Sequence, residues 1–362
     1  MSIITDARAY LVDLPVEAVR TDAVQSFLKQ ETIFVEITTS DGLLGRGYSY
    51  TIGTGGTAIL AMLSDYLLPK LIHRDARHTE AIWRDLFAST RATAVGAITS
   101  LALAAVDTAL WDWRCRRTDQ PLWIAAGGAS DRVPLYDTEV GWLHLSIDEL
   151  ISGAKAALDS GRGGVKIKIG KPDPAEDVER LAAVRGALGP GIDLMVDANQ
   201  SLTAADAVRR ARLLEPVDIY WVEEPLPADD IAGHARLARS TTIPVAVGES
   251  LYSIGQFAEY IQQGAVGIVQ ADVARIGGIT PWLKVAHLAE AHNISVCPHF
   301  LMELHVSLCA AVPNSRYVEY IPQLTAITSS RLAIEDGAAL APDTPGLGID
   351  WDLDAIDDHR VA

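Results

Sequence analysis

Six ionisable residues recur along the second half of this 362-residue chain at intervals of 23 to 29 residues. Such an interval matches one strand, one helix and their loops, since a βαβ unit takes about 30 residues or more. A closed ring of parallel strands would bring the six side chains to one mouth, where a metal ion, two bases and a substrate carboxylate could meet. The six residues are Lys168, Asp197, Glu223, Glu249, Asp272 and His299.

Three carboxylates of this set lie at the ends of successive apolar segments. They are Asp197 in VDAN, Glu223 in VEEP and Glu249 in VGES. Clustered together, they would repel one another and raise one another's pKa unless a cation held them. Oxygen ligands suit a hard ion, so we predict one Mg²⁺ per subunit, with Mn²⁺ as a substitute. The alternative is that each acid only caps or begins a helix, but equal spacing on three successive strands disfavours it.

Two lysines, Lys166 and Lys168, lie two residues apart in VKIKIG and therefore project from the same face of a strand. Repulsion between them, and a nearby metal ion, would lower the pKa of Lys168 and make it a neutral base near pH 7. We predict both lysines to be catalytic. An exposed edge strand is the alternative, but a central barrel strand has no exposed edge.

A histidine and an aspartate are expected side by side, because His299 in VCPHF follows Asp272 in VQAD by one strand–helix unit. A carboxylate that accepts a proton from one ring nitrogen fixes the tautomer and makes the other nitrogen more basic. The pair would supply a second base facing Lys168. The alternative is a structural histidine on an apolar strand.

A further acid, Glu319 in RYVEYI, ends the last apolar strand. It could donate or accept a hydrogen bond at a substrate carboxylate oxygen where negative charge accumulates, or it could be a solvated strand-end acid. The chemistry that needs this set is removal of a proton α to a carboxylate, which forms a dianionic enolate. A divalent cation, a lysine and a protonated acid would stabilise it. Lys168 and His299 would remove or return the proton, giving inversion or loss of a β-leaving group.

Alternating strands and helices must position these residues. From residue 133 onward, eight short apolar strands alternate with Ala-rich helices, which predicts an α/β fold with a modified (β/α)8 barrel over residues 128–322. Residues 1–127 predict an α+β capping domain, with a hairpin turning at Asp41-Gly42 and helices beginning near Ala58, Thr79 and Val95. We expect residues 323–362 to pack back on this capping domain and complete it. The strand sequences are VPLYDTEV, GVKIKI, IDLMVDAN, IYWVEEP, IPVAVGES, VGIVQAD, ISVCPHF and YVEYI.

Length and charge agree with a two-part enzyme. The chain exceeds the ~250–300 residues at which one core usually stops growing. Its formal charge of −17 repels nucleic acid and anionic membranes, so we expect a small-molecule carboxylate as partner. The three cysteines argue against a disulfide framework. With no basic leader in MSIITDARAY and no apolar run of ~18 residues, we expect a cytoplasmic protein.

The motifs together resemble the enolase superfamily, in its mandelate racemase-like branch. They are K-x-K ending at Lys168, DAN, EEP, GES, D-x-x-R-x-GG at residues 272–278 and PHF at His299. The resemblance implies a capping domain over a modified barrel and Mg²⁺ on Asp197, Glu223 and Glu249. It also implies Lys168 and His299 as bases, Asp272 as partner of His299, and Glu319 on the substrate carboxylate. Members of the family are commonly dimers or octamers, so we expect a homo-oligomer.

Three segments, GGVKIKIG, DLMVDANQ and VCPHFLMELHVSLCAAVPN, most resemble acid sugar dehydratases that act on talarate and galactarate. Selectivity in this family comes from capping-domain loops, here residues 16–29 and 48–57. A diacid needs a distal cation, but the second loop has none, and only Arg20 and Lys29 occur in the first. An acid such as Glu139 would suit a hydroxyl or ammonium group better, so a monoacid or amino-acid-like substrate stays open. The predicted substrate-binding residues are Asn199, Arg20, Tyr50, Glu139 and Trp142.

The leading hypothesis is a Mg²⁺-dependent acid sugar dehydratase that produces a 2-keto-3-deoxy acid. A racemase or epimerase of a 2-hydroxy or amino acid, or a cycloisomerase of sugar lactones, would use the same bases. A non-catalytic binding protein that keeps the barrel is disfavoured, because every expected catalytic position has a residue suited to catalysis. A Schiff-base aldolase would not need three metal-spaced carboxylates.

Overall fold

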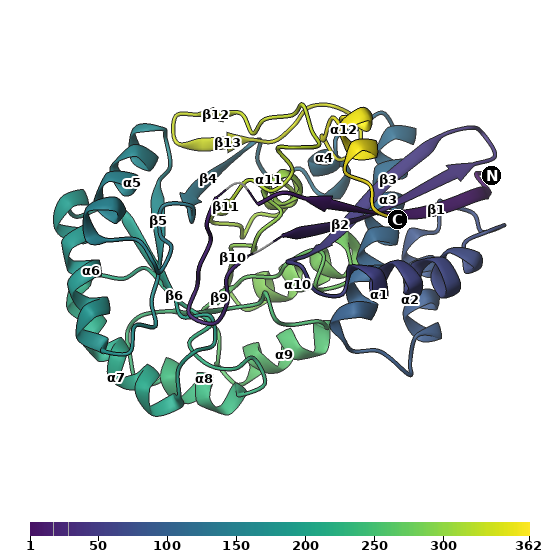
Figure 1. The fold of residues 1–362 in the computed structure, drawn as a ribbon. Coiled ribbons are helices and arrows are strands. Elements are labelled where there is room, and N and C mark those ends of the chain that lie inside the picture. The colour runs from purple at the N-terminus through teal and green to yellow at the C-terminus, as the bar shows by residue number, and fades with distance from the viewer. Residues whose placement is uncertain (17, 28) are drawn as a thin grey trace.

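The computed structural model describes residues 1–16, 18–27 and 29–362. Residues 17 and 28 belong to the predicted selectivity loop 16–29 and lie outside the described residues. Figure 1 shows the N-terminal unit on the right and the barrel on the left, with the loop between β1 and β2 crossing from one to the other.

The capping unit is a three-stranded antiparallel sheet, in the order β1-β2-β3, covered by helices. The predicted hairpin is confirmed: β2 and β3 are joined through Gly42, whose φ of 79° suits a residue without a side chain. Helix α3 lies directly on β3, because a Cβ on Gly47 would come within 2.2 Å of the backbone of Ala109. The elements are β1 (Ile4–Leu14), β2 (Gln30–Thr39), β3 (Leu44–Thr51), α1 (Gly56–Ala61), η1 (Met62–Leu67), η2 (Leu68–Lys70), α2 (Thr79–Ser89), α3 (Ala97–Arg117) and α4 (Leu122–Ala126).

The predicted barrel is confirmed. Strands β4 to β10 pair in chain order and in parallel. β11 pairs in parallel with β4, and a bridge between Val296 and Ser315 closes the ring. The strands are β4 (Arg132–Asp137), β5 (Gly164–Lys168), β6 (Asp193–Asp197), β7 (Val222–Glu223), β8 (Val245–Val247), β9 (Ile268–Val269), β10 (Ser295–Val296) and β11 (Val318–Tyr320).

Helices α5 to α11 follow these strands in turn and form the outer layer (Figure 1). Their starts carry the expected caps: Ser146 and Glu149 form a reciprocal capping box on α5, and Asp173 caps α6 just before Pro174. The helices are α5 (Ile147–Asp159), α6 (Pro174–Leu188), α7 (Ala204–Leu214) with η3 (Glu215–Val217), α8 (Ile231–Ala238), α9 (Ile254–Gln262), α10 (Ile279–Ala291) and α11 (Met302–Ala311).

Several strands are shorter than the apolar segments predict. The segment 219–225, for example, is paired as a strand only at Val222–Glu223. The chain leaves the sheet immediately after the motif residues, and Asn199, Glu224 and Phe300 have positive φ angles of 43°, 37° and 60°. Such angles are unfavourable for residues other than glycine and cluster at functional sites. The backbone therefore turns sharply where the strand-end side chains emerge.

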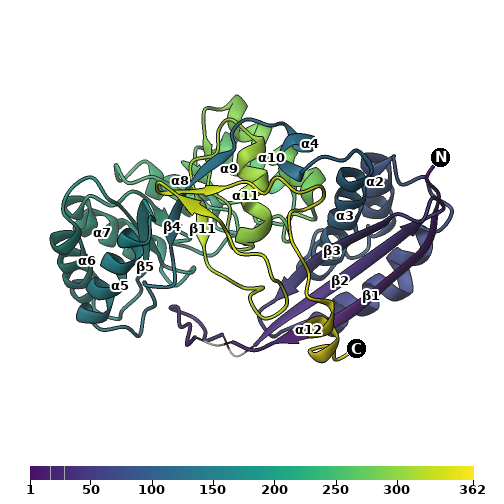
Figure 2. The same cartoon turned by 90° about the horizontal axis from the view of Figure 1, so that it is seen from above.

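The C-terminal segment divides its contacts between the two units. β12 (Ile334–Glu335) and β13 (Ala338–Leu340) extend the barrel sheet, with β13 antiparallel to β4. Trp351 then packs edge-on against the rings of Phe34 and Tyr48 in the capping sheet, and α12 (Leu353–Asp358) follows. Figure 2 shows this strap running from the barrel to β1, where Leu11 donates a backbone hydrogen bond to Ala362.

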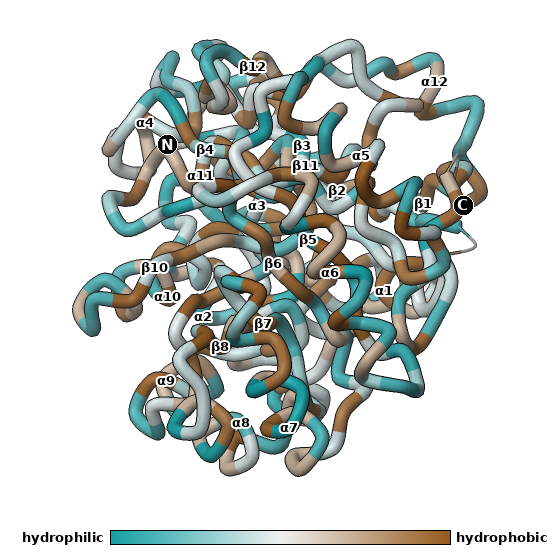
Figure 3. The backbone as a smooth tube through the Cα atoms, turned by 90° about the vertical axis from the view of Figure 1, so that its left-hand side faces the viewer, coloured by the Kyte–Doolittle hydropathy of each residue, from teal (hydrophilic) through white to brown (hydrophobic). Residues whose placement is uncertain are grey.

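The core follows the strands. Hydrophobic stretches run through the interior of the barrel, and hydrophilic stretches are frequent in the outer turns (Figure 3). The ends of the strands break this pattern, because charged residues such as Lys166 and Asp197 are as buried there as their apolar neighbours. Within the described residues, no helix is both long enough and apolar enough to cross a membrane.

Candidate active site

Three carboxylates meet at the carboxyl ends of β6, β7 and β8. Asp197 is the last residue of β6, Glu223 is the last residue of β7, and Glu249 lies two residues past β8. One oxygen from each of them lies within 4.8 Å of the others. Parallel pairing explains the convergence, because neighbouring strands end at the same edge of the sheet.

This set of oxygens fits Mg²⁺, which prefers carboxylate ligands. Burial and the charge of Asp197 raise the pKa of Glu223 to about 7, although Lys166 lies against Glu223 and opposes the shift. The lysines therefore leave part of the negative charge uncompensated. A divalent cation held by Asp197, Glu223 and Glu249 would supply the positive charge that these carboxylates lack.

The two lysines of β5 point into the ring, as their spacing predicts. Lys166 is 1% exposed and lies among carboxylates, with its Nζ 2.8 Å from Glu223 and 2.9 Å from Glu319. Lys168 Nζ lies 2.5 Å from Oδ2 of Asp197 and 5.4 Å from the ring centre of Trp142. Lys166 also lies 3.6 Å from Oδ2 of Asp197, so this aspartate contacts both lysines.

The direction of the Lys168 shift differs from the sequence-based expectation. Burial and Lys166 lower the pKa of Lys168, but the charge of Asp197 raises it, and the net pKa is above its usual value. Spacing alone showed the repulsion between Lys166 and Lys168. It did not show the direct contact with Asp197, which outweighs that repulsion.

The predicted histidine–aspartate pair is present. His299 Nδ1 lies 2.9 Å from Oδ2 of Asp272, and the same oxygen accepts a hydrogen bond of 2.6 Å from the hydroxyl of Tyr50. Burial raises the pKa of Asp272, but the hydrogen bond and charge of His299 lower it to about 2. Burial lowers the pKa of His299, whereas Glu249 and the bond to Asp272 raise it above its usual value. His299 therefore has a fixed ring and an enhanced basicity.

Glu319 is engaged on both oxygens. Thr138 donates to Oε1 at 2.5 Å, and the backbone N–H of Phe300 donates to Oε2 at 2.7 Å. Burial raises the pKa of Glu319, but Lys166 and His299 lower it well below the usual range. Glu319 is therefore an ionised acceptor in this arrangement, which fits the accepting one of its two expected roles. Lys166 is the donor at this position.

The predicted substrate-binding residues fall into two groups. Tyr50, Trp142 and Asn199 line one pocket with both lysines and His299. Arg20 and Glu139 instead line a neighbouring pocket, where Arg20 Nε pairs with Glu139 at 3.0 Å. The sequence placed these two residues near the site, but it could not show that they neutralise each other.

Other lining residues were missed by sequence reasoning. The loop between β1 and β2 contributes Asp22, Gln25 and Phe27. Arg275 lines the pocket as well and donates to the carbonyl of Glu249 at 3.1 Å. Arg275 could have been found from the sequence, since it is the arginine of the D-x-x-R motif. No sequence motif marks Thr138, because its contact with Glu319 depends on β4 lying beside β11.

The pocket is closed by the loop from the capping unit. Its free space is about 30 Å³, far below the roughly 300 Å³ or more of a typical small-molecule site. Phe27 packs edge-on against Trp142 at 5.6 Å, and Leu143 N donates to Thr21 O at 2.9 Å. A sugar-sized ligand must therefore displace side chains of this loop when it enters.

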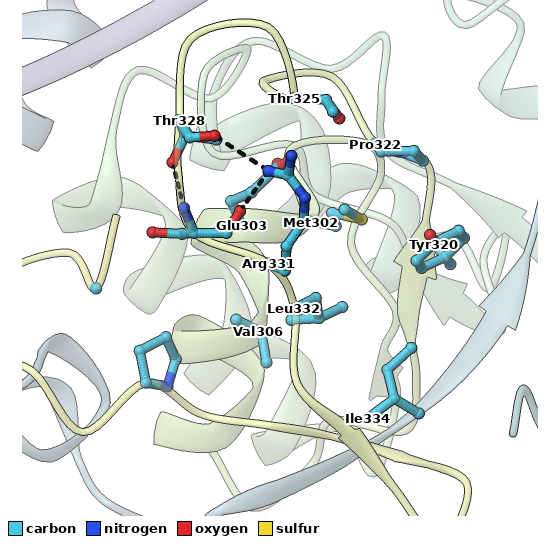
Figure 4. Close-up of a pocket in the computed structure, with 13 residues that line it drawn as sticks. Met302, Glu303, Val306, Tyr320, Pro322, Thr325, Thr328, Arg331, Leu332 and Ile334 are labelled. Carbon is cyan, nitrogen blue, oxygen red and sulfur yellow. Dashed lines mark hydrogen bonds between the residues drawn. The ribbon is translucent and has the colours of Figure 1, made fainter. Parts of the chain in front are cut away.

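A larger cavity of about 390 Å³ lies elsewhere, between α11 and the C-terminal segment. Figure 4 shows Arg331 there, bonded to the carbonyls of Thr328 and Ser330 rather than to an acid. Its walls are largely apolar, with Met302 and Leu332 among them. Because the strand-end carboxylates and bases do not line it, the smaller pocket is the candidate active site.

Comparisons with known proteins agree with this geometry. Residues 7–127 match the mandelate racemase / muconate lactonizing enzyme N-terminal domain, and residues 149–355 match the family described as enolase C-terminal domain-like. The chain is 36% identical over 98% of both lengths to a 3,6-anhydro-alpha-L-galactonate cycloisomerase of Streptomyces coelicolor. It is 37% identical, over 87% of its own length and 79% of the relative, to the L-talarate/galactarate dehydratase of Salmonella typhimurium.

A crystal structure of that dehydratase, liganded with Mg and L-lyxarohydroxamate, aligns with a TM-score of 0.95. The alignment covers 100% of this chain and 93% of the other, at 34% identity. The carboxylate trio is thus a magnesium site both by its own chemistry and by comparison with a magnesium-bound relative.

Proposed function

The chain belongs to the mandelate racemase / muconate lactonizing enzyme family of the enolase superfamily, and on this premise we propose that it is a Mg²⁺-dependent dehydratase of sugar acids. One observation carries the proposal: Lys168 and His299 line the same pocket from different parts of the ring, beside the carboxylate trio. In the ring, β5 and β10 are separated by β11 and β4 in one direction and by β6 to β9 in the other.

The first step is removal of the proton at C2 of the sugar acid. A cation held by Asp197 would offset the charge that raises the pKa of Lys168. In its neutral form Lys168 takes this proton, and the electron pair moves toward the adjacent carboxylate. When bound by Asp197, Glu223 and Glu249, Mg²⁺ supplies positive charge that offsets these carboxylates and stabilises the negative charge on the substrate. The ammonium group of Lys166 acts in the same direction.

The second step is loss of the hydroxyl at C3. His299, whose pKa is raised by Glu249 and Asp272 against the effect of burial, is protonated and gives its proton to the departing oxygen as water forms. The resulting enol takes a proton at C3 and becomes a 2-keto-3-deoxy acid. Asp272 and Tyr50 hold the imidazole during this transfer through the bonds at 2.9 and 2.6 Å.

A direct assay tests this proposal. The purified protein, freed of metal and then supplied with Mg²⁺, is incubated with a panel of mono- and diacid sugars. Semicarbazide detects the 2-keto acid. We expect signal with at least one sugar acid and none without Mg²⁺, and the product is lighter than the substrate by one water. Absence of signal across a broad panel counts against the proposal.

A second candidate is a cycloisomerase, favoured by the 36% identity to the anhydrogalactonate enzyme over 98% of the chain. In a sugar acid whose C3 oxygen belongs to an ether ring, the same two steps open the ring, and the leaving oxygen stays attached. The product then has the mass of the substrate. Mass spectrometry therefore separates the two candidates.

An oligomer is also proposed, because the family resemblance implies a dimer or an octamer. Light scattering during size-exclusion chromatography measures the mass in solution, and a value near that of one 38.9 kDa chain would contradict it.

A further inference from the structure

The wall of the active-site pocket that faces the strand ends carries no cation contributed by the capping unit, within the residues that the structure describes. The capping unit lines the pocket with Asp22, Gln25, Phe27, Tyr50 and Ile52. Asp22 is the only charged group among them, and it is negative. A ligand whose carboxylate lies at the strand ends would therefore meet a neutral or acidic surface at its other end.

The two cations of the selectivity loop are occupied elsewhere. Arg20 is 9% exposed and pairs with Glu139 through Nε at 3.0 Å. Its other nitrogens donate to Gln323 and to the carbonyl of Pro322, each at 3.1 Å. Lys29 bridges Asp13 at 3.1 Å and Glu31 at 3.2 Å.

Neither of these cations lines the pocket. To reach a ligand, Arg20 would have to leave the half-buried Glu139 without its partner. Lys29 would have to exchange two carboxylates for one. The ion pairs therefore hold both cations away from the distal end of a substrate.

The remaining cations of the pocket belong to the strand ends. Lys166 and Lys168 contact the carboxylate trio. Arg275 is flanked by Glu249 and Asp272, each at 3.9 Å. These groups surround the reacting end of the ligand rather than its far end.

The carboxylate of Asp22 is held in place through one oxygen, and its other oxygen can accept a further hydrogen bond. It is 4% exposed, and its Oδ1 accepts hydrogen bonds from the backbone N–H groups of Val24 at 2.7 Å and Gln25 at 2.8 Å. In the described part of the chain, these are the hydrogen bonds of its side chain, so Oδ2 is left to accept another. The loop is seated close to Lys168, because a Cβ on Gly170 would come within 2.8 Å of the Ala23 side chain.

From this distribution of charge we propose that the site selects monocarboxylate sugar acids, with Asp22 of the capping loop accepting a hydrogen bond from a hydroxyl of the ligand and repelling a second carboxylate. The inference rests on the proposed function and names its substrate class. Open-chain aldonates and their anhydro forms both belong to this class, since each has one carboxylate and hydroxyls along the chain. A sugar diacid would bring a second negative charge against Asp22.

Matched substrate pairs test the inference. The wild type, Asp22→Asn and Asp22→Lys are assayed with the aldonate and the aldarate of the same configuration, for the galacto, gluco and manno series, and with an anhydro-aldonate. We expect the wild type to favour a monoacid over the matching diacid by about tenfold or more in kcat/KM, the discrimination that one misplaced charged group readily gives.

Removal of the charge should reduce this preference. Asp22→Asn lowers the ratio of kcat/KM for the monoacid to kcat/KM for the matching diacid. Asp22→Lys lowers this ratio further or reverses the preference. The control is Val24→Lys, which makes the loop more positive by one charge, as Asp22→Asn does, but at a side chain that is 62% exposed. Val24→Lys should keep the wild-type ratio. If Asp22→Lys does not fold, Asp22→Asn alone decides, and an unchanged ratio in Asp22→Asn overturns the role of Asp22.

The outcomes separate this inference from the proposed function. Turnover of diacids as well as or better than monoacids overturns the inference and leaves the dehydratase proposal intact. Absence of turnover with every acid contradicts the dehydratase proposal, and calorimetric binding with Mg²⁺ present then decides the inference. Tighter binding of the monoacid supports it, and equal or weaker binding, or none, overturns it.

Discussion

The Oδ2 atom of Asp272 lies 2.9 Å from Nδ1 of His299, so one carboxylate oxygen orients the imidazole from the neighbouring strand end. Asp272 is buried three residues past the end of β9, and His299 lines the pocket. The pair therefore fixes the ring, whose Nε2 lies 3.3 Å from Oε2 of Glu249 at the pocket. This relationship makes His299 suited to proton transfer rather than to packing.

Replacement of Asp272 by Asn should remove this support. We expect kcat to fall by about 10²–10⁴-fold, the range that positioned acid–base groups contribute. The pKa of His299 should also fall, because the bond and charge of Asp272 raise it. If His299 acts as the acid, the alkaline limb of the kcat–pH profile moves to lower pH. A variant with an unchanged profile would show that Asp272 does not act through His299.

Replacement of Tyr50 by Phe tests whether its hydroxyl acts through Asp272 or on the substrate. The hydroxyl donates to Asp272 at 2.6 Å, so we expect a reduced kcat and a shifted pH profile, with KM nearly unchanged. Loss of the donor leaves Asp272 more negative and His299 more basic, which moves the profile to higher pH. A large rise in KM with an unchanged pH profile would instead indicate direct substrate binding.

Magnesium should stabilise the folded protein through the carboxylate trio. A ligand present at 100 times its Kd stabilises by about 2.7 kcal/mol, so the thermal midpoint should rise on addition of Mg²⁺. Glu249→Gln should abolish most of this rise, because it removes one of the three carboxylates. The exposed Asp229→Asn is the matched control and should keep it. Equal responses in the two variants would place the ion elsewhere.

A buried acid between the two units should make stability depend on pH. Asp107 of α3 accepts hydrogen bonds from the backbone N–H and the hydroxyl of Thr280 on α10, at 2.8 and 2.7 Å. Burial raises its pKa from 3.8 to about 7, although Thr280 opposes this. The folded state therefore binds the proton more tightly than the unfolded state. The contribution of Asp107 to stability is therefore greatest below about pH 4 and falls as pH rises from about 4 through about 7, by up to about 1.4 kcal/mol per pH unit.

Asp107→Asn removes this dependence. Compared with the wild type, the variant should gain relative stability between pH 5 and pH 7, which thermal midpoints at a series of pH values measure. Thr280→Ser, which keeps both donors, serves as a control and should retain the wild-type trend. A constant difference between wild type and Asp107→Asn over this range would show that the carboxyl does not titrate there.

The sequence predicted the fold and most of the strand-end residues, because both depend on local pattern. A carboxylate that ends each of three successive apolar strands must converge with the others once the ring closes, so the positions of Asp197, Glu223 and Glu249 followed from spacing. The same reasoning placed His299 beside Asp272. The direction of Lys168 and Lys166 followed from the two-residue repeat of a strand.

Long-range pairing could not be predicted in this way. Gln323 binds Arg20 across 303 positions of the chain, and the Arg20–Glu139 ion pair removes the cation that the loop composition offered to a diacid. Spacing also gave no sign that Asp197 would touch Lys168 and reverse the expected pKa shift. Asp22 was overlooked because a loop acid is common on any surface. Its burial against the pocket is a property of the folded loop.

The central claim is that Lys168 and His299 remove and deliver protons at the carbon beside a carboxylate. Proton NMR in D₂O, with Mg²⁺ and the best sugar acid from the panel, tests it most directly. We predict loss of the C2 proton and deuterium at C3 of the 2-keto-3-deoxy product. Lys168→Ala and His299→Ala should each reduce turnover by at least about 10²-fold while remaining folded. Lys155→Ala, at an exposed position, should leave turnover unchanged. Turnover that is unchanged in both active-site variants, or a product that keeps its C2 proton, would contradict the account.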